Sequence, residues 1–132
     1  MTPTELLQTY YRAFNQQDLT LFLSTLSDDV VHDVNEGGRH HGKAPFEAFW
    51  ATMARCYQEE IVDIEIMFNA DQNRAAVEYR VLGKYLATDE GLPEANGQTY
   101  DLPGGAFFEI QDGHITRISN YYNLNAWLQQ IA

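Results

Sequence analysis

Hydrophobic side chains recur every three to four residues in three stretches of the first half of the chain, which is the spacing of amphipathic helices. Thr2 and Pro3 predict the start of the first helix, which is expected to end near Asn15. Asp18 is expected to cap a second, shorter helix, and a third helix beginning near Pro45 carries a wide aromatic stripe. The first half is therefore predicted to be mainly helical.

Beyond Glu60 the pattern changes to an alternation of hydrophobic and polar residues, which predicts β-strands. In the first of these strands Ile64 and Ile66 are expected on one face, with Asp63 and Glu65 on the other. An earlier short strand is expected around residues 30–34, and later ones over residues 75–85, 98–110 and 114–122, before a short final helix.

Helices segregated from a mostly antiparallel sheet define the α+β class, here as a single domain over residues 1–132. A strongly bent sheet wrapped around the first and third helices would form a cone. A cone of this size is expected to leave a cavity at its open end.

Composition excludes several classes of partner. Eight basic against nineteen acidic residues give a formal net charge of -11, which repels phosphate backbones and anionic lipids, so neither nucleic acid nor a membrane is expected as a partner. The single cysteine, Cys56, cannot form an internal disulfide, and no signal-like apolar segment follows Met1. A cytoplasmic protein is expected.

Titratable side chains are densest between Asp28 and Gly42, in and after the first strand. His32 suits a general base, or it is a histidine that only forms hydrogen bonds in the cavity mouth. Asp33 is a second candidate base, or a solvated strand residue or loop cap, and Asn35 orients a substrate carbonyl or belongs to the glycine turn. Neighbouring strand residues face opposite sides, and the valines around them leave open whether His32 or Asp33 faces inward.

Two further histidines, His40 and His41, follow the glycine loop. Adjacent histidines there lack the spacing of a zinc or iron site, so we expect neither a metal nor any other cofactor. His114 follows a turn and is expected to be exposed.

Aromatic residues are abundant enough to suggest a cavity for flat or ring-shaped ligands, although core packing is the default for any one of them. The residues expected to line it are Trp50, Tyr79, Phe108 and Tyr122. The acidic stretch from Thr88 to Gly97 is either a lid over this cavity or a solvated hairpin end.

The segments Tyr10–Leu19, Ser27–Val31 and Asp112–Ile118, in this order of elements, resemble the nuclear transport factor 2-like superfamily. Within it the chain is most similar to ketosteroid isomerase-like and SnoaL-like (polyketide cyclase-like) bacterial proteins. The resemblance implies a cone that holds a small hydrophobic molecule, while the superfamily includes enzymes of several kinds and plain binders.

The same resemblance implies an incomplete steroid isomerase set. That set has a tyrosine donor, an aspartate base and a protonated aspartic acid. The tyrosine corresponds to Tyr10, but the base falls on Val34, one position from Asp33, and the acid falls on Gly105 or Ala106.

The sequence thus predicts a protein that binds a small hydrophobic, carbonyl-bearing molecule and carries out cofactor-free acid/base chemistry on it. In this hypothesis His32 or Asp33 is the base, Tyr10 is the donor, and Asn35 and Tyr122 orient the ligand. The alternative is a non-catalytic binding or dimerisation module of the same fold. A homodimer is expected because Ile61, Met67 and Leu82 would leave hydrophobic side chains on the outer sheet face.

Overall fold

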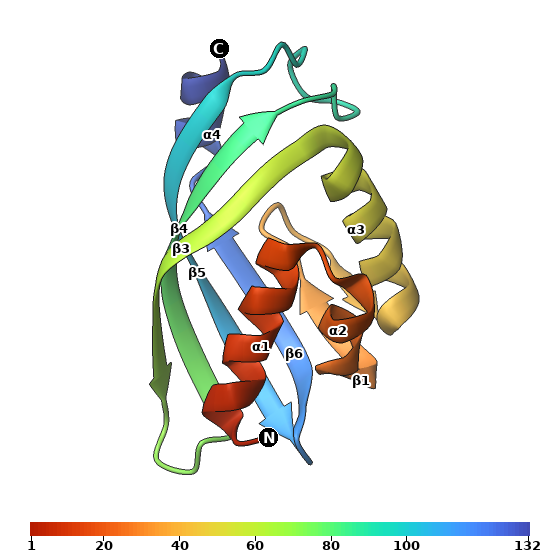
Figure 1. Ribbon diagram of the computed structural model, residues 1–132, viewed down its shortest axis with the longest axis vertical. Coiled ribbons are helices and arrows are strands. Elements are labelled where there is room, and N and C mark those ends of the chain that lie inside the picture. Colours follow the sequence, from red (N-terminus) through yellow and green to blue (C-terminus); the bar gives the residue numbers. More distant parts are fainter.

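The computed structural model describes residues 1–132 as four helices packed against one curved, unclosed sheet of six strands (Figure 1). The predicted α+β cone is confirmed. The elements in chain order are α1 (Pro3–Gln16), α2 (Leu19–Ser24), β1 (Leu26–Asp33), β2 (Arg39–His41), α3 (Lys43–Cys56), β3 (Tyr57–Phe68), β4 (Arg74–Tyr85), β5 (Thr99–Gln111), β6 (His114–Tyr122) and α4 (Leu124–Ile131).

The strands lie in the order β2-β1-β6-β5-β4-β3. Every neighbouring pair is antiparallel except β1 and β6, which run parallel. The helices α1, α2 and α3 cover the concave face, and α4 lies at the far end of the sheet (Figure 1). The short strand β2 was not expected from the sequence, and it extends the sheet beyond the glycine loop.

Local sequence explains the first helix. The Thr2 side chain accepts a hydrogen bond from the backbone of Glu5, whose carboxylate bonds back to Thr2, and the helix ends at Gln17 in a left-handed conformation. Its buried face carries Leu6, Leu7, Tyr10, Tyr11 and Ala13 toward the sheet. Two neighbouring tyrosines are thereby placed inside the cone.

One expectation about β3 was wrong. The register of β3 against β4 shifts between Val62 and Glu65, where Asp63 adopts a positive φ of 52°. This bulge reverses which side chains face inward, so Ile61 is buried in the core and not on the outer surface. Before the bulge the odd-numbered residues Tyr57, Glu59 and Ile61 point to the concave side.

Two buried clusters support the fold. The larger one joins α1 and α2 to residues of β1, β3, β4, β5 and β6, and Phe108 is fully buried within it. The smaller one surrounds Tyr85 and Trp127, where α4 closes the end of the sheet. None of the helices is long and apolar enough to cross a membrane.

Candidate functional site

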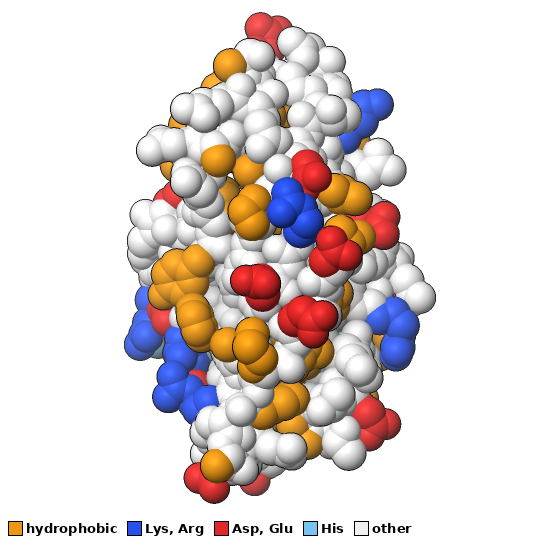
Figure 2. Space-filling view, turned by 90° about the vertical axis from the view of Figure 1, so that its left-hand side faces the viewer, with side chains coloured by type: hydrophobic (Ala, Val, Ile, Leu, Met, Phe, Trp, Pro, Cys, Tyr) orange, Lys and Arg blue, Asp and Glu red, His pale blue; other side chains and the backbone are white.

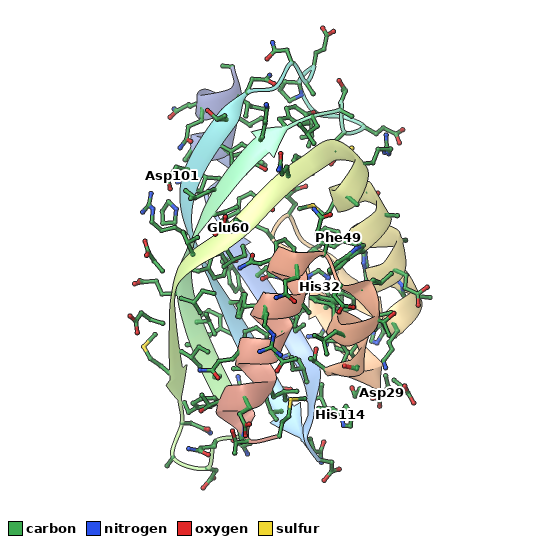
Figure 3. The ribbon with its side chains drawn as sticks, in the orientation of Figure 1. Asp29, His32, Phe49, Glu60, Asp101 and His114 are labelled. Atoms are coloured by element: carbon green, nitrogen blue, oxygen red, sulfur yellow. The ribbon has the colours of Figure 1, made fainter.

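A cavity of about 570 Å³ lies between the concave face of the sheet and the helices α1, α2 and α3. Most of its lining is hydrophobic and aromatic. Figure 3 shows His32 and Phe49 between these helices and the sheet, whereas Asp101 and His114 lie at the periphery. Of the residues predicted from the sequence, the lining includes Tyr10, His32, Asn35, Trp50, Tyr79 and Tyr122. Phe108 does not line it and belongs to the core, which corrects its expected role in binding.

His32 is the most deeply buried titratable residue of β1, with 3% of its surface exposed. Its ring stacks on Phe46 with centroids 4.7 Å apart, and its Nε2 atom lies 3.1 Å from the side-chain nitrogen of Asn120 on β6. Burial, followed by the nearby His40, lowers the pKa of His32 from 6.5 to about 4. At neutral pH the imidazole is therefore uncharged and able to accept a proton.

The Asn120 amide can turn either its NH₂ group or its oxygen toward the imidazole. Asn120 can therefore form a hydrogen bond with His32 Nε2 in both of its states. Its NH₂ group donates when this nitrogen is unprotonated, and its oxygen accepts when this nitrogen carries a proton. Asn120 was missed by the sequence analysis. Its position in an alternating strand was visible, but its partner on β1 depends on the parallel pairing of β1 with β6.

Asp33 points away from the cavity, and the strand parity that the sequence left open is thus decided in favour of His32. The Asp33 carboxylate pairs with Arg39 at 2.7 Å and with Arg117 at 3.6 Å. The hydrogen bond from Arg39 lowers the pKa of Asp33 below its usual value. Asp33 is held ionised in a surface ion-pair cluster, and its assignment as a catalytic base is wrong for this arrangement.

Three buried phenols, those of Tyr10, Tyr11 and Tyr79, line the cavity. Burial raises the pKa of all three, that of Tyr79 to about 12. The Tyr11 hydroxyl is buried without any hydrogen-bond partner in the protein. These hydroxyls stay protonated and offer donors to a ligand oxygen. Tyr11 was missed because sequence periodicity places both neighbours on the helix without showing which reaches the cavity.

Glu59 on β3 was also missed, because the bulge that places this carboxyl on the inner face could not be recognised from local periodicity. It lines the cavity, and the Tyr100 hydroxyl donates a hydrogen bond to its Oε2 atom.

The mouth of the cavity is acidic and held by side-chain hydrogen bonds. The Tyr122 hydroxyl donates to Glu36 at 3.0 Å, and the Tyr57 hydroxyl donates to Asp89 at 2.8 Å. The Asn35 side chain accepts a hydrogen bond from the backbone N–H of Tyr122 at 2.8 Å. Asn35 therefore lines the cavity and also joins the loop after β1 to the end of β6. Residues of the acidic stretch 88–97 therefore border the opening, and no lysine or arginine lines the cavity.

No three or more histidine, cysteine, aspartate or glutamate side chains come together as a group that could hold a metal ion. His40, His41 and His114 are exposed. The expectation that the protein needs neither metal nor cofactor stays a prediction.

The sequence model of SnoaL-like domains matches residues 7–118. The chain belongs to the SnoaL-like family. Its structure is similar to that of a proposed polyketide cyclase from Pseudomonas putida KT2440, with 59% identity, coverage of 100% of this chain and 99% of that one, and a TM-score of 0.97.

Two other proposed polyketide cyclases are each 50% identical to this SnoaL-like chain. The one from Xanthomonas campestris has a TM-score of 0.95, with coverage of 98% and 96% of the two chains. The one from Silicibacter has a TM-score of 0.96, with coverage of 98% and 95%. Among curated proteins, none matches the chain.

Proposed function

We propose that this SnoaL-like protein binds an uncharged, carbonyl-bearing ring compound and catalyses cofactor-free proton transfer on it, as an isomerase, cyclase or dehydratase. The observation that carries the proposal is the neutral His32 imidazole at the wall of an aromatic cavity that is also lined by Tyr11, whose buried hydroxyl has no hydrogen-bond partner in the protein. The similarity to proposed polyketide cyclases supports the same class of chemistry.

The mechanism begins with a carbonyl oxygen at the phenol end. A hydrogen bond from Tyr10, which is 7% exposed and lines the cavity, stabilises the negative charge that develops on this oxygen. His32 takes a proton from the carbon next to the carbonyl, so that an enol-type intermediate forms. Return of the proton to another carbon, or attack of the enol carbon on a second carbonyl, completes an isomerisation or a cyclisation.

Charge restricts the substrate. The carboxyl side chains near the opening are those of Glu36, Asp89 and Glu90, and no lysine or arginine lines the cavity. An anionic ligand would be repelled without compensation, so the substrate is uncharged.

The set of a steroid isomerase is incomplete in this cavity. Val34 lines the wall where that enzyme has its base, and the inward-facing Ala106 cannot donate a side-chain hydrogen bond. We therefore expect no efficient turnover of Δ5-3-ketosteroids.

The test uses 2-tetralone, an uncharged bicyclic ketone with acidic hydrogens next to its carbonyl. Exchange of its C1 hydrogens in D₂O is followed by proton NMR with and without protein. We expect catalysed exchange that falls about 100-fold or more in His32→Ala, the usual scale of a general base. Asp33→Asn, one position away on the opposite face, should retain the rate. Exchange no faster than in buffer, or an unchanged rate in His32→Ala, would contradict the proposal.

A non-catalytic binding module is the second candidate. The observation in its favour is the engagement of His32 by both Asn120 and Phe46, which is typical of a histidine that is only structural. Saturable binding of 2-tetralone, measured by tryptophan fluorescence, without any catalysed exchange would support this alternative.

A homodimer through the outer sheet face is the expected assembly. Met67, Leu82, Phe107 and Tyr121 are each more than 40% exposed there, and the rings of Phe107 and Tyr121 lie 5.7 Å apart. Figure 2 looks onto this side of the molecule, where hydrophobic side chains lie among charged ones. The buried free thiol of Cys56 agrees with the predicted cytoplasmic location.

A further inference from the structure

Glu59 occupies a cross-strand row that extends over three strands. In the register of the sheet Glu59 on β3 faces Gly83 on β4, and Gly83 in turn faces Tyr100 on β5. The two side chains are thus separated by a whole strand. Strands lie almost 5 Å apart, so a contact between the outer members of such a row needs a long side chain and an empty middle position.

Gly83 supplies the empty position. A Cβ atom there would overlap the Tyr100 ring, which lies across the glycine and donates a hydrogen bond from its hydroxyl to Glu59 Oε2. Tyr100 is itself 95% buried, with 5% of its surface exposed, and its ring packs against Trp127 of α4. The carboxyl is therefore held in one orientation by a buried donor.

The surroundings of this carboxyl favour its neutral form. Burial raises the pKa of Glu59, and the hydrogen bond from Tyr100 opposes that rise without cancelling it. The groups that face Glu59 are phenols, namely Tyr79 on β4, Tyr100 on β5 and Tyr122 on β6. Burial is the main cause that raises the pKa of each, followed by the nearby Glu59 for Tyr79 and Tyr100 and by Glu36 before Glu59 for Tyr122. No lysine or arginine lines the cavity to stabilise the carboxylate.

We propose that Glu59 is a second proton-transfer group of this cavity, a carboxylic acid that donates its proton to the ligand's carbonyl oxygen, with Tyr100 as its positioning residue. The proposal rests on the function proposed above. Tyr100 is the only group whose side chain forms a hydrogen bond with the carboxyl, so the other oxygen, Oε1, has no side-chain partner on a residue that lines the cavity.

The proton balance is complete within the protein. The O–H bond of Glu59 breaks as an O–H bond forms on the ligand oxygen, and the resulting carboxylate keeps the hydrogen bond from Tyr100. His32 takes the proton from the neighbouring carbon, and the C–H electron pair becomes part of the enol double bond. In the second half His32 returns its proton to a different carbon and the enol O–H returns its proton to Glu59. Both residues regain their starting states, and no oxidant or reductant is consumed.

The experiment compares the pH dependence of 2-tetralone exchange in the wild type, Glu59→Gln, Glu59→Asp and Tyr100→Phe. The glutamine side chain can still accept the hydrogen bond from Tyr100, but it cannot transfer a proton. We expect kcat to fall about 100-fold in Glu59→Gln with little change in KM, the usual scale of a general acid, and the alkaline limb of the wild-type profile to disappear. Glu59→Asp should recover part of kcat.

Tyr100→Phe separates positioning from a merely structural role. Without the hydrogen bond that stabilises the carboxylate, the alkaline limb should move to higher pH. Carbon-13 NMR of labelled glutamate carboxyls, with the Glu59 signal identified by its loss in Glu59→Gln, gives a readout that does not depend on activity. The signal should titrate above 4.5, the ordinary value for glutamate, and higher still in Tyr100→Phe.

The outcomes that overturn the proposal are distinct from those that overturn the function. If the wild type is active and Glu59→Gln has the same rate and pH profile, the proposed role of Glu59 is wrong but the proposed function stands. A Glu59 signal that titrates at its ordinary value leads to the same conclusion. If the wild type catalyses no exchange, both the proposed function and the proposed proton transfer by Glu59 are wrong.

Discussion

The side-chain nitrogen of Asn120 lies 3.1 Å from His32 Nε2 and joins two strands whose contacting residues are 88 positions apart in the chain. The contact exists because β1 and β6 pair in parallel, with His32 opposite Ile118. Asn120 lies two residues after Ile118 on the same face of β6, so its side chain meets that of His32 within the cavity. The centre of the candidate site is therefore built at the one parallel pair of the sheet.

The buried imidazole should make stability depend on pH. The folded pKa of His32, about 4, lies below its ordinary value of 6.5, so between these pH values the unfolded chain binds more protons than the folded one. The free energy of unfolding should therefore fall as the pH decreases from 6.5 to 4, by up to about 3 kcal/mol from this group. Urea unfolding of the wild type and of His32→Gln at several pH values measures how steeply the free energy of unfolding changes with pH in each protein. Equal slopes in the two proteins would contradict the prediction.

Gly83→Ala should break the row that holds Glu59. The added methyl group would overlap the Tyr100 ring, so the ring must move and lose its hydrogen bond to Glu59. We expect the free energy of unfolding to decrease by about 1–3 kcal/mol, the usual cost of overpacking. Gly105→Ala is the control, since a Cβ atom there would lie 3.3 Å from the Val77 oxygen and should cost less. A larger loss in the control would refute the argument.

Tyr11→Phe should change stability and binding in opposite directions. The Tyr11 hydroxyl is buried without a partner, so its removal should raise the free energy of unfolding by about 1 kcal/mol. The same change should weaken 2-tetralone binding about fivefold, because a donor to the carbonyl is lost. Thermal melts and fluorescence titration measure both quantities.

The matched control is Tyr85→Phe, which removes a fully buried hydroxyl bonded to Pro93 and Asp89 at 2.6 and 3.0 Å. This variant should be destabilised. If Tyr11→Phe is destabilised to the same extent, the Tyr11 hydroxyl has a partner within the folded protein.

Phe107→Asp should convert the proposed dimer into a monomer. Phe107 is 48% exposed on the outer sheet face, and a carboxylate there would have to be buried without a partner in a dimer interface. Light scattering at micromolar concentration measures the mass. Phe49→Asp, which places the same charge on α3 at 43% exposure, should leave the dimer intact. A monomeric wild type would contradict the assembly itself.

Sequence alone was sufficient for the fold class and for every helix and strand except the short β2. The capping box at Thr2, the alternation in β4 and the turn before His114 are local features, and each is determined by residues within a few positions of one another. The family resemblance implied the same cone, and the structure confirms both the family and the curved sheet. His32 could be named as a candidate because titratable residues are dense between Asp28 and Gly42, and Tyr10 because the family resemblance aligns it with the isomerase tyrosine.

Only the tertiary structure decided which of these groups face the cavity. A side chain's direction in a strand changes with every residue and with every bulge, so the choice between His32 and Asp33, and the inward turn of Glu59 before the bulge at Asp63, depended on strand pairing. The contacts of His32 with Asn120 and of Glu59 with Tyr100 join distant parts of the chain. Local periodicity carries no information about such pairs, because their register is set by the packing of the whole sheet.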